Sequence, residues 1–402
     1  MKSFFLKAWP FFALSFLALV LHFAWLNYPS QVVFDEVHFG KFVAGYFTHE
    51  YFFDIHPPLG KMMIAFTAKA FSVNPVFAFD RIGEAVPAAT LVALRFLPAL
   101  FGAGLVLLFS WLAYLLSRRR SVALFAGALA ILDTALLVQS KFILVDIFLL
   151  CFEILTLIFF LLYQRQPPGR RGRRLFFLGL TGLFFGLTIS VKWTGLAVLS
   201  IIGLALAGKF IWPNWAAYFS PQNNFNRRKN FREIITNLLI IGTLGFLMYL
   251  IPFWFHFKIL DKPGPGNAFM SQTFQAELKY GRGVLSAPLT FPEKFLELNQ
   301  TMFRANAGIT SEHAFGSRWW GWPFNVRPVY YWNQEIITDH SGWQAKIYLT
   351  GNPLLWWLVF FGVLAAFAQG FFRSRDNTLK PAFLWLVAAY LVNLLPFIFI
   401  GR

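Results

Sequence analysis

Residues 87–116 read PAATLVALRFLPALFGAGLVLLFSWLAYLL, and this stretch decides the class of fold. Its one charged residue is Arg95. A helix needs about 20 apolar residues to cross the hydrocarbon layer of a bilayer, and this run is longer than that. The basic run Arg118-Arg119-Arg120 follows almost directly, as expected where a spanning helix reaches the cytoplasm. The stretch therefore predicts a transmembrane helix that carries a charged residue near its outer end.

The rest of the chain has the same apolar character. Of its 402 residues, 57% are hydrophobic, 20% are aromatic and 13% are charged, whereas soluble domains are about 25% charged. The composition excludes an ordinary soluble domain and a disordered chain. The single cysteine, Cys151, excludes an intrachain disulfide. We expect an all-α polytopic membrane protein with about nine spans, at residues 8–26, 87–116, 121–138, 142–163, 175–190, 194–212, 234–256, 353–372 and 381–400.

The net charge of +17 is distributed unevenly over the connections between these spans. The N-terminus and the short connections are rich in Lys and Arg, while the long loops 27–86 and 257–352 are balanced in charge. The positive-inside rule places the basic segments in the cytoplasm and both long loops on the external face. The basic excess is thus a topology signal, which argues against nucleic acid as a partner. We interpret residues 1–402 as a single transmembrane domain with two large external loops.

The external loops contain amphipathic patterns. Helix-like spacing of apolar residues follows Phe34, a second pattern follows Pro57-Pro58, and a third begins at Pro292. These segments are expected to form helices that lie at the membrane surface or against the bundle.

Several ionisable residues are expected at one depth, near the external headgroup level. A cationic cluster at this depth suits a lipid-linked phosphate, because arginine and lysine donate to phosphate oxygens. The alternative is that these side chains are anchors at span ends that snorkel outward. The residues concerned are Arg95, Lys141, Lys192, Asp133 and Asp146.

The pair Asp35-Glu36 lies on the external side, shortly after the first span. One interpretation is capping of the following helix, because aspartate is a favoured N-cap and acids suit a first helical turn. The other is catalysis, in which a carboxylate accepts a proton from an incoming hydroxyl group. The two interpretations are compatible. Histidines here lack a metal-binding spacing such as HExxH, and nucleotide-binding glycine loops are missing. We therefore expect that no metal or other cofactor is required.

A family resemblance adds to this interpretation. The stretch YPSQVVFDEVHFGKFVAGYFTHEYFFDIHPPLGK, residues 28–61, closely resembles the first external loop of protein O-mannosyltransferases. The similarity covers about residue 22 to the end, and continues through ALRFLPALFG, FILVD, SVKWTGL, SRWWGWPFNVRPVYYW and GNPLLWW. It implies a membrane glycosyltransferase of the GT-C type that transfers mannose from polyprenyl (dolichyl) phosphate to serine or threonine. It also implies a bacterial-type member, because the loop 257–352 is too short for the MIR domain of eukaryotic members.

The resemblance implies roles for individual residues. The catalytic pair of the family matches Asp35 and Glu36, and its donor-phosphate contacts match Arg95 and Lys192. Further residues expected to position substrate are His38, His56, Lys61, Arg318, Trp319 and Arg327. Two departures are relevant: His22 stands where the family commonly has arginine, and the chain ends at Arg402, where members continue with further spans.

The sequence thus predicts a plasma-membrane enzyme of bacterial type with its active site on the external face. Asp35 would deprotonate the acceptor hydroxyl, and direct attack would invert the anomeric centre. The expected partners are polyprenyl phosphate mannose, an exported Ser/Thr-containing polypeptide, the bilayer and the protein-export translocon. One alternative is a GT-C enzyme that moves an isoprenoid-linked sugar such as aminoarabinose to a lipid acceptor. Another is a transporter, although its charges would cross the midplane instead of gathering outside.

Overall fold

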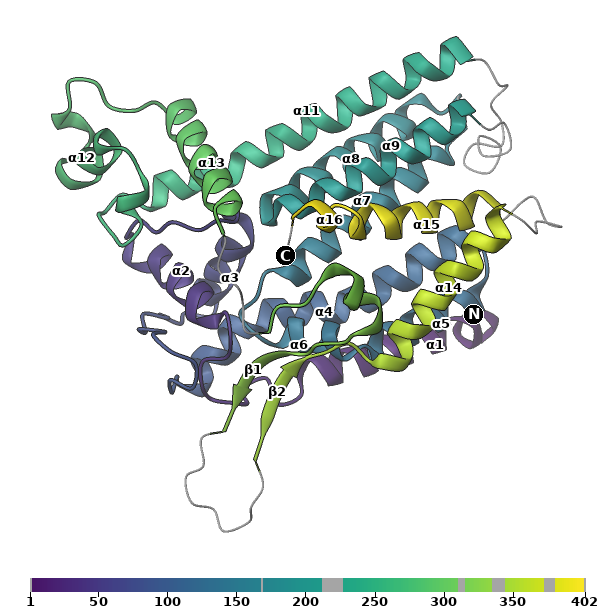
Figure 1. The fold of residues 1–402 in the computed structure, drawn as a ribbon, viewed down its shortest axis with the longest axis horizontal. Helices are drawn as coiled ribbons and strands as arrows, with labels where there is room; N and C mark the ends of the chain where they lie inside the picture. Colours follow the sequence, from purple (N-terminus) through teal and green to yellow (C-terminus); the bar gives the residue numbers. More distant parts are fainter. Residues whose placement is uncertain are drawn as a thin grey trace.

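The computed structural model describes residues 2–167, 169–211, 227–309, 315–334, 344–371 and 380–400. Long helices run side by side and form the body of the molecule (Figure 1). Helices of both long loops lie together at one end of these long helices, on the left of Figure 1: α2 (Glu36–Thr48), α3 (Leu59–Ala70), α12 (Gln272–Tyr280) and α13 (Phe291–Ala307). The expected all-helical membrane bundle is confirmed.

The expected spans correspond to apolar helices. Within the described residues, five helices are long and apolar enough to cross a membrane, or six if one bent pair is a single span. Three shorter apolar helices coincide with the other expected spans, at residues 8–23, 193–208 and 353–369. The helices of the bundle are α1 (Lys2–Phe23), α4 (Ala88–Ser117), α5 (Arg120–Leu132), α6 (Thr134–Lys141), α7 (Asp146–Gln164), α8 (Arg171–Val191), η1 (Trp193–Gly195), α9 (Leu196–Ile211), α11 (Arg227–Ile259), α14 (Pro353–Phe371), α15 (Lys380–Leu394) and α16 (Phe397–Ile400).

The third expected span differs from its prediction. Residues 121–138 do not form one straight helix, because α5 and α6 meet at Asp133 with a bend of 62°. Asp133 has an extended backbone, and its Oδ1 accepts a hydrogen bond from Leu136 N at 3.0 Å, which caps α6. Its Oδ2 accepts from Trp356 Nε1 at 2.8 Å. Asp133 therefore ends one helix and starts the next, and does not lie in the turn between the third and fourth spans.

Both long loops contain the predicted helices. The first loop holds α2 (Glu36–Thr48) and α3 (Leu59–Ala70). The second holds η2 (Asn267–Phe269), α12 (Gln272–Tyr280), η3 (Arg282–Val284), α13 (Phe291–Ala307), η4 (Trp319–Phe324) and the antiparallel strands β1 (Val329–Asn333) and β2 (Lys346–Leu349). The loops are joined through their backbones: Tyr51 N donates to Lys262 O at 2.9 Å, and Lys262 N donates to His49 O at 3.0 Å.

The core is centred on α7, which packs against α4 and α8. Close approach of α8 and α11 depends on small residues. A Cβ atom added at Gly186 would lie 2.6 Å from the carbonyl oxygen of Gly245, too close for any side chain. Small residues of this kind let membrane helices pack backbone to backbone. This packing fixes the end of α7 that begins at Asp146 and the end of α8 that precedes Lys192.

Candidate active site

Asp35 is the N-cap residue of α2, but its side chain does not cap that helix. The structure describes all of α2, and no side-chain hydrogen bond joins Asp35 to its first turn. Glu36, the first residue of α2, ties the helix to the chain before it, because its Oε2 accepts from Val33 N at 2.8 Å. Asp35 is half-buried, and Glu36 is fully buried. Helix capping therefore does not occupy the Asp35 carboxylate.

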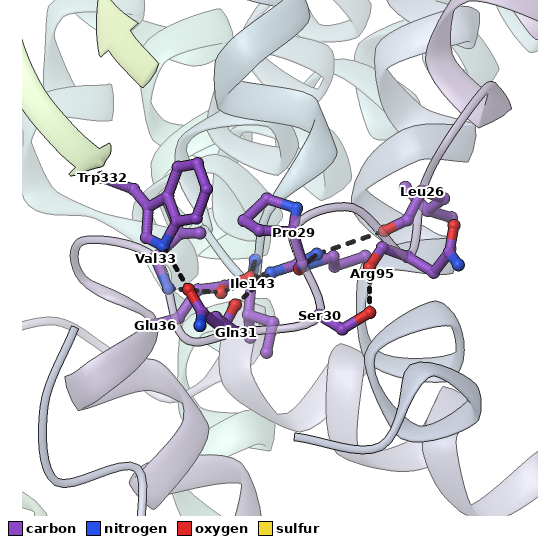
Figure 2. Close-up of polar contacts among 10 residues, drawn as sticks. Leu26, Pro29, Ser30, Gln31, Val33, Glu36, Arg95, Ile143 and Trp332 are labelled. Atoms are coloured by element: carbon purple, nitrogen blue, oxygen red, sulfur yellow. Dashed lines mark hydrogen bonds and ion pairs between the residues drawn. The ribbon is translucent and has the colours of Figure 1, made fainter. Parts of the chain in front are cut away.

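Glu36 and Arg95 form a buried two-pronged ion pair, with both side chains 0% exposed. Arg95 Nε donates to Glu36 Oε1 at 2.8 Å, and a terminal nitrogen donates to Oε2 at 2.8 Å. Figure 2 shows the guanidinium reaching across the connection between α1 and α2. The remaining hydrogen bonds of the guanidinium go to the carbonyl oxygens of Leu26 (3.2 Å), Pro29 (3.0 Å) and Gln31 (3.0 Å).

In this structure all the donors of Arg95 have protein partners, and a contact of Arg95 with the donor phosphate stays a prediction. A guanidinium has five N–H donors, and five hydrogen bonds to protein acceptors are present. A phosphate would have to displace protein acceptors from a site without solvent exposure. Glu36 is equally engaged, because Ile143 N also donates to its Oε1 at 2.9 Å. The pair therefore joins α2, α4, the chain after α1 and the connection between α6 and α7.

Lys192 lies at the site and is paired with Asp146. Lys192 follows the last residue of α8, Asp146 opens α7, and their side chains meet at 2.7 Å. The side chains are 18% and 32% exposed, so this pair is reachable from outside, unlike Glu36 and Arg95. Of the two residues that the resemblance matched to donor-phosphate contacts, Arg95 is fully buried and Lys192 is in a partly open position. A lysine is a compact charge that can rotate toward an arriving anion.

Lys61 and Asp54 form a third ion pair, within the first long loop. Lys61 Nζ donates to Asp54 Oδ2 and to the carbonyl oxygen of His56, the latter at 2.8 Å. It also lies 5.6 Å from the ring centroid of Phe42. Burial alone would raise the pKa of Asp54, but the charges of Lys61 and His56 lower it overall. Lys61 thus fixes the turn that carries His56, and its own charge is already paired.

His56 lies among these charges as a neutral ring. Burial, followed by the positive charge of Lys192, lowers the pKa of His56 from 6.5 to about 4. Asp54 and Asp146 oppose this shift, and Lys61 adds to it. The turn is also tied to the second long loop, because Asn306 Nδ2 of α13 donates to Ile55 O at 2.8 Å. A neutral imidazole at this position can accept or donate a hydrogen bond at physiological pH.

The other predicted positioning residues lie in exposed places. His38 is exposed on α2, and Arg318 and Arg327 are exposed at the two ends of the η4 segment. Arg327 donates to the carbonyl oxygen of Gly316 at 2.8 Å, within its own loop. Trp319 begins η4, which packs against α14. These contacts place η4 beside α14 and do not join it to Asp35.

Tyr331 is a residue near Asp35 that was not predicted from the sequence. Its ring stacks on Phe34, directly before Asp35, with centroids 4.1 Å apart and an angle of 9° between the ring planes. The signal in the sequence was the run VYYW at residues 329–332, in which aromatic residues on a short strand indicate a buried face. Nothing in that pattern shows that the strand lies against the first long loop.

A metal site is not evident in the described part of the chain. No group of three or more His, Cys, Asp or Glu side chains there is arranged to hold a metal ion. The absence of a metal requirement stays a prediction.

These features define a class of protein. A helical membrane bundle with a carboxylate and cations under two long loops has the architecture of the GT-C fold. Two solved structures share the fold. The protein O-mannosyltransferase Pmt1–Pmt2 complex of S. cerevisiae bound to the sugar donor matches with a TM-score of 0.77, at 18% identity over 98% of this chain and 84% of that chain. The archaeal oligosaccharyltransferase AglB of Archaeoglobus fulgidus matches with a TM-score of 0.52, at 12% identity over 97% of this chain and 49% of that chain.

The family follows from the sequence comparisons. Residues 12–261 match the model of dolichyl-phosphate-mannose-protein mannosyltransferases, and residues 291–402 match the model of the C-terminal four-helix membrane region of protein O-mannosyltransferases. The chain therefore belongs to the dolichyl-phosphate-mannose–protein mannosyltransferase family, as the resemblance predicted.

Individual relatives agree with this assignment. Dolichyl-phosphate-mannose–protein mannosyltransferase 4 of Saccharomyces cerevisiae is 36% identical over 65% of this chain and 34% of its own length. Protein O-mannosyltransferase 1 of Drosophila pseudoobscura is 32% identical over 88% of this chain and 37% of its own length. The chain spans about a third of the length of these relatives.

Proposed function

We propose that this protein transfers mannose from a polyprenyl phosphate to a serine or threonine hydroxyl of an exported polypeptide. The observation that carries the proposal is the state of Asp35. Its carboxylate is half-buried, is not used as a helix cap, and follows a segment that the Glu36–Arg95 pair anchors. A carboxylate that neighbouring groups hold in place is suited to act as a general base.

The mechanism assigns one step to each charged group. Asp35 accepts the proton of the acceptor hydroxyl as its oxygen attacks the anomeric carbon of mannose. The bond between that carbon and the phosphate oxygen breaks at the same time, so the anomeric configuration inverts. Lys192 turns from Asp146 toward the departing phosphate and stabilises its negative charge. Glu36 and Arg95 hold the loop that carries Asp35, and the neutral His56 lies beside the leaving group.

The orientation of the protein in the membrane is inferred from the distribution of Lys and Arg over the connections between spans. The short basic connections favour the cytoplasm, so the N-terminus is cytoplasmic and Asp35 acts on the external face. A bacterial plasma membrane fits the short second loop. The acceptor must reach Asp35 unfolded on that face, which makes the protein-export translocon a suitable delivery partner.

A direct assay tests the function. The purified protein in lipid is incubated with polyprenyl phosphate mannose and a threonine peptide, and the peptide is weighed by mass spectrometry. We expect a peptide heavier by one hexose. A parallel incubation with a glycolipid acceptor and isoprenoid-linked aminoarabinose tests the alternative. A modified lipid together with an unmodified peptide would overturn the proposal.

A further inference from the structure

Lys192 lies in a tight connection that a hydrogen bond of its neighbour ties to another helix. Its backbone is extended between α8 and η1, and Gly195 ends η1. A Cβ atom added at Gly195 would lie 2.4 Å from Thr188 Cγ2, so η1 packs directly on the last turn of α8. Trp193 follows Lys192, and its Nε1 donates to Tyr249 Oη of α11 at 2.8 Å. The place of Lys192 therefore depends on a contact with α11.

The hydroxyl of Tyr249 has two partners, and their chemistry sets the direction of its hydrogen bonds. An indole N–H can only donate, so Tyr249 Oη accepts from Trp193. Tyr249 Oη donates its one proton to Asn299 Oδ1 of α13, at 2.6 Å. Asn299 Nδ2 donates in turn to the carbonyl oxygen of Phe295 at 2.8 Å, one turn earlier in α13. Tyr249 is 7% exposed, so loss of one partner would leave buried polar atoms without a hydrogen bond.

The helix α13 is connected to the turns on which Lys192 and His56 lie. Asn299 reaches the Lys192 turn through the hydrogen bonds just described. Asn306 follows Asn299 by seven residues, a spacing that puts both on one face of a helix. Asn306 Nδ2 donates to the carbonyl oxygen of Ile55, next to His56, at 2.8 Å. One helix of the second long loop therefore holds both turns.

We propose that Tyr249 is a positioning residue for the transfer reaction, which holds Lys192 in place through Trp193 and makes that place depend on α13. Lys192 is the partly exposed cation assigned to the departing phosphate. A shift of about 1 Å in such a group lowers the rate strongly. The second long loop thereby influences the use of the lipid-linked donor. The inference rests on the proposed function, because it concerns the same Lys192.

Tyr249→Phe tests the role directly, because it removes the hydroxyl and with it both hydrogen bonds. The ring stays packed on Phe253 and Phe295, whose centroids lie 4.9 Å and 5.8 Å away. We expect kcat/KM for polyprenyl phosphate mannose to fall about tenfold, with the KM for the peptide within about twofold of the parent. A merely structural hydroxyl would lower Tm and leave these constants unchanged in the folded enzyme. An unchanged kcat/KM for the donor overturns the proposal.

The matched control is Tyr163→Phe, near the end of α7 opposite to Asp146. The Tyr163 side chain is 3% exposed, and its hydroxyl donates to Asn237 Oδ1 at 3.0 Å and accepts from Arg174 at 2.9 Å. The control thus removes the same group from an equally buried network and should keep kcat/KM for the donor within about twofold. A loss equal to that of Tyr249→Phe would show a general effect of hydroxyl deletion and overturn the proposal.

The α13 end of the connection has its own variant. Asn299→Leu removes the acceptor of the Tyr249 proton and keeps a side chain of similar size. We expect kcat/KM for the donor to fall about threefold to tenfold, with little further loss when Tyr249→Phe is added. An unchanged constant in Asn299→Leu would overturn the dependence of Lys192 on α13.

A double-mutant cycle tests whether Tyr249 acts through Lys192. In a Lys192→Met background the positioned group is absent, so adding Tyr249→Phe should lower kcat/KM for the donor by less than about twofold. A full tenfold further loss would mean that Tyr249 acts independently of Lys192, and would overturn the proposal.

Binding of polyprenyl phosphate, without sugar, measures the same coupling without turnover. Tyr249→Phe should raise the Kd of this lipid about threefold to tenfold, and should not raise it further in Lys192→Met. Equal affinities of the parent and Tyr249→Phe would overturn the role of Tyr249. If the parent transfers no mannose while Tyr249→Phe still weakens binding, the proposed function fails and the positioning of Lys192 stands.

Discussion

Glu36 and Arg95 lie 59 residues apart in the chain and meet in a bidentate ion pair without solvent exposure. The pair joins the first turn of α2 to α4, and its other hydrogen bonds reach the chain after α1 and the connection before α7. A buried charge pair costs desolvation free energy, which only a full set of partners offsets. Glu36 and Arg95 both have such a full set of hydrogen-bond partners. The consequence is a fixed starting point for the helix that follows Asp35.

Breaking this pair should destabilise the protein. Arg95→Met leaves the Glu36 carboxylate buried without its partner, at a cost of about 3 to 5 kcal/mol in the free energy of unfolding. The double variant with Glu36→Met removes both charges and should recover part of that loss. Thermal unfolding in detergent measures both. The control is Lys41→Met, which breaks an exposed ion pair with Asp80 and should leave Tm unchanged.

The same variants discriminate between the two roles of Arg95. If its main task were to bind the donor phosphate, Arg95→Met would keep the Tm of the parent and raise the KM for the donor. That result would contradict the positioning role described above.

Removing the Asp35 carboxylate should remove the reaction. Asp35→Asn keeps the size of the side chain and loses the proton acceptor, so the rate of peptide mannosylation should fall by about 10² to 10⁴. Thermal unfolding of Asp35→Asn measures any effect on the fold separately from the loss of transfer. Asp80→Asn is the matched control, because Asp80 lies in the same loop with its side chain 71% exposed. Full transfer activity by purified Asp35→Asn would exclude this residue as the base.

Replacing Lys192 should reduce use of the donor more than it reduces the stability of the fold. Lys192→Met should lower kcat/KM for polyprenyl phosphate mannose by about 100-fold, because a cation that stabilises the leaving phosphate is lost. Lys192→Arg keeps the charge and should lose less. Lys279, exposed on α12, provides the control substitution Lys279→Met. Equal losses in Lys192→Met and Lys279→Met would show that the effect is one of net charge alone.

The low pKa of His56 makes the stability of the protein depend on pH. The unfolded chain binds a proton at His56 below pH 6.5, whereas the folded chain does so only below about 4. Between these values the unfolded state holds more protons, so the free energy of unfolding falls as the pH falls. His56→Gln should weaken this dependence in thermal unfolding between pH 6.5 and 4. The same slope in both proteins would show that His56 titrates normally in the folded chain.

Chelation of divalent ions should leave the enzyme active. The proposed reaction uses Asp35 as base and Lys192 as the cation, and assigns no step to a metal ion. Transfer in EDTA should therefore stay within about twofold of the rate in buffer, since two carboxylates alone are a weak cage for a divalent cation. Mannosylation assays before and after EDTA, with Mg²⁺ or Mn²⁺ added back, make the comparison. Activity lost in EDTA and restored by one metal would require a different mechanism.

The sequence by itself determined the membrane class, most of the spans, the helices of the external loops and the family. These features depend on local patterns: apolar runs of sufficient length, helical spacing after Phe34 and Pro58, and long motifs in order. It also selected Asp35, because an acidic pair at the start of an external helix is a local feature. The break at Asp133 was missed, since a single aspartate in an apolar run does not reveal its partner Trp356 on a distant helix.

Only the tertiary structure decided which cation is fully buried in an ion pair and which is partly exposed. Arg95 and Lys192 look alike in sequence, as cations at the ends of spans. Folding buries one against Glu36 with five hydrogen bonds and leaves the other at a partly open pair with Asp146. The stack of Tyr331 on Phe34 likewise joins residues almost 300 positions apart. Such pairings depend on which helices become neighbours in the packed bundle, and no local pattern contains that information.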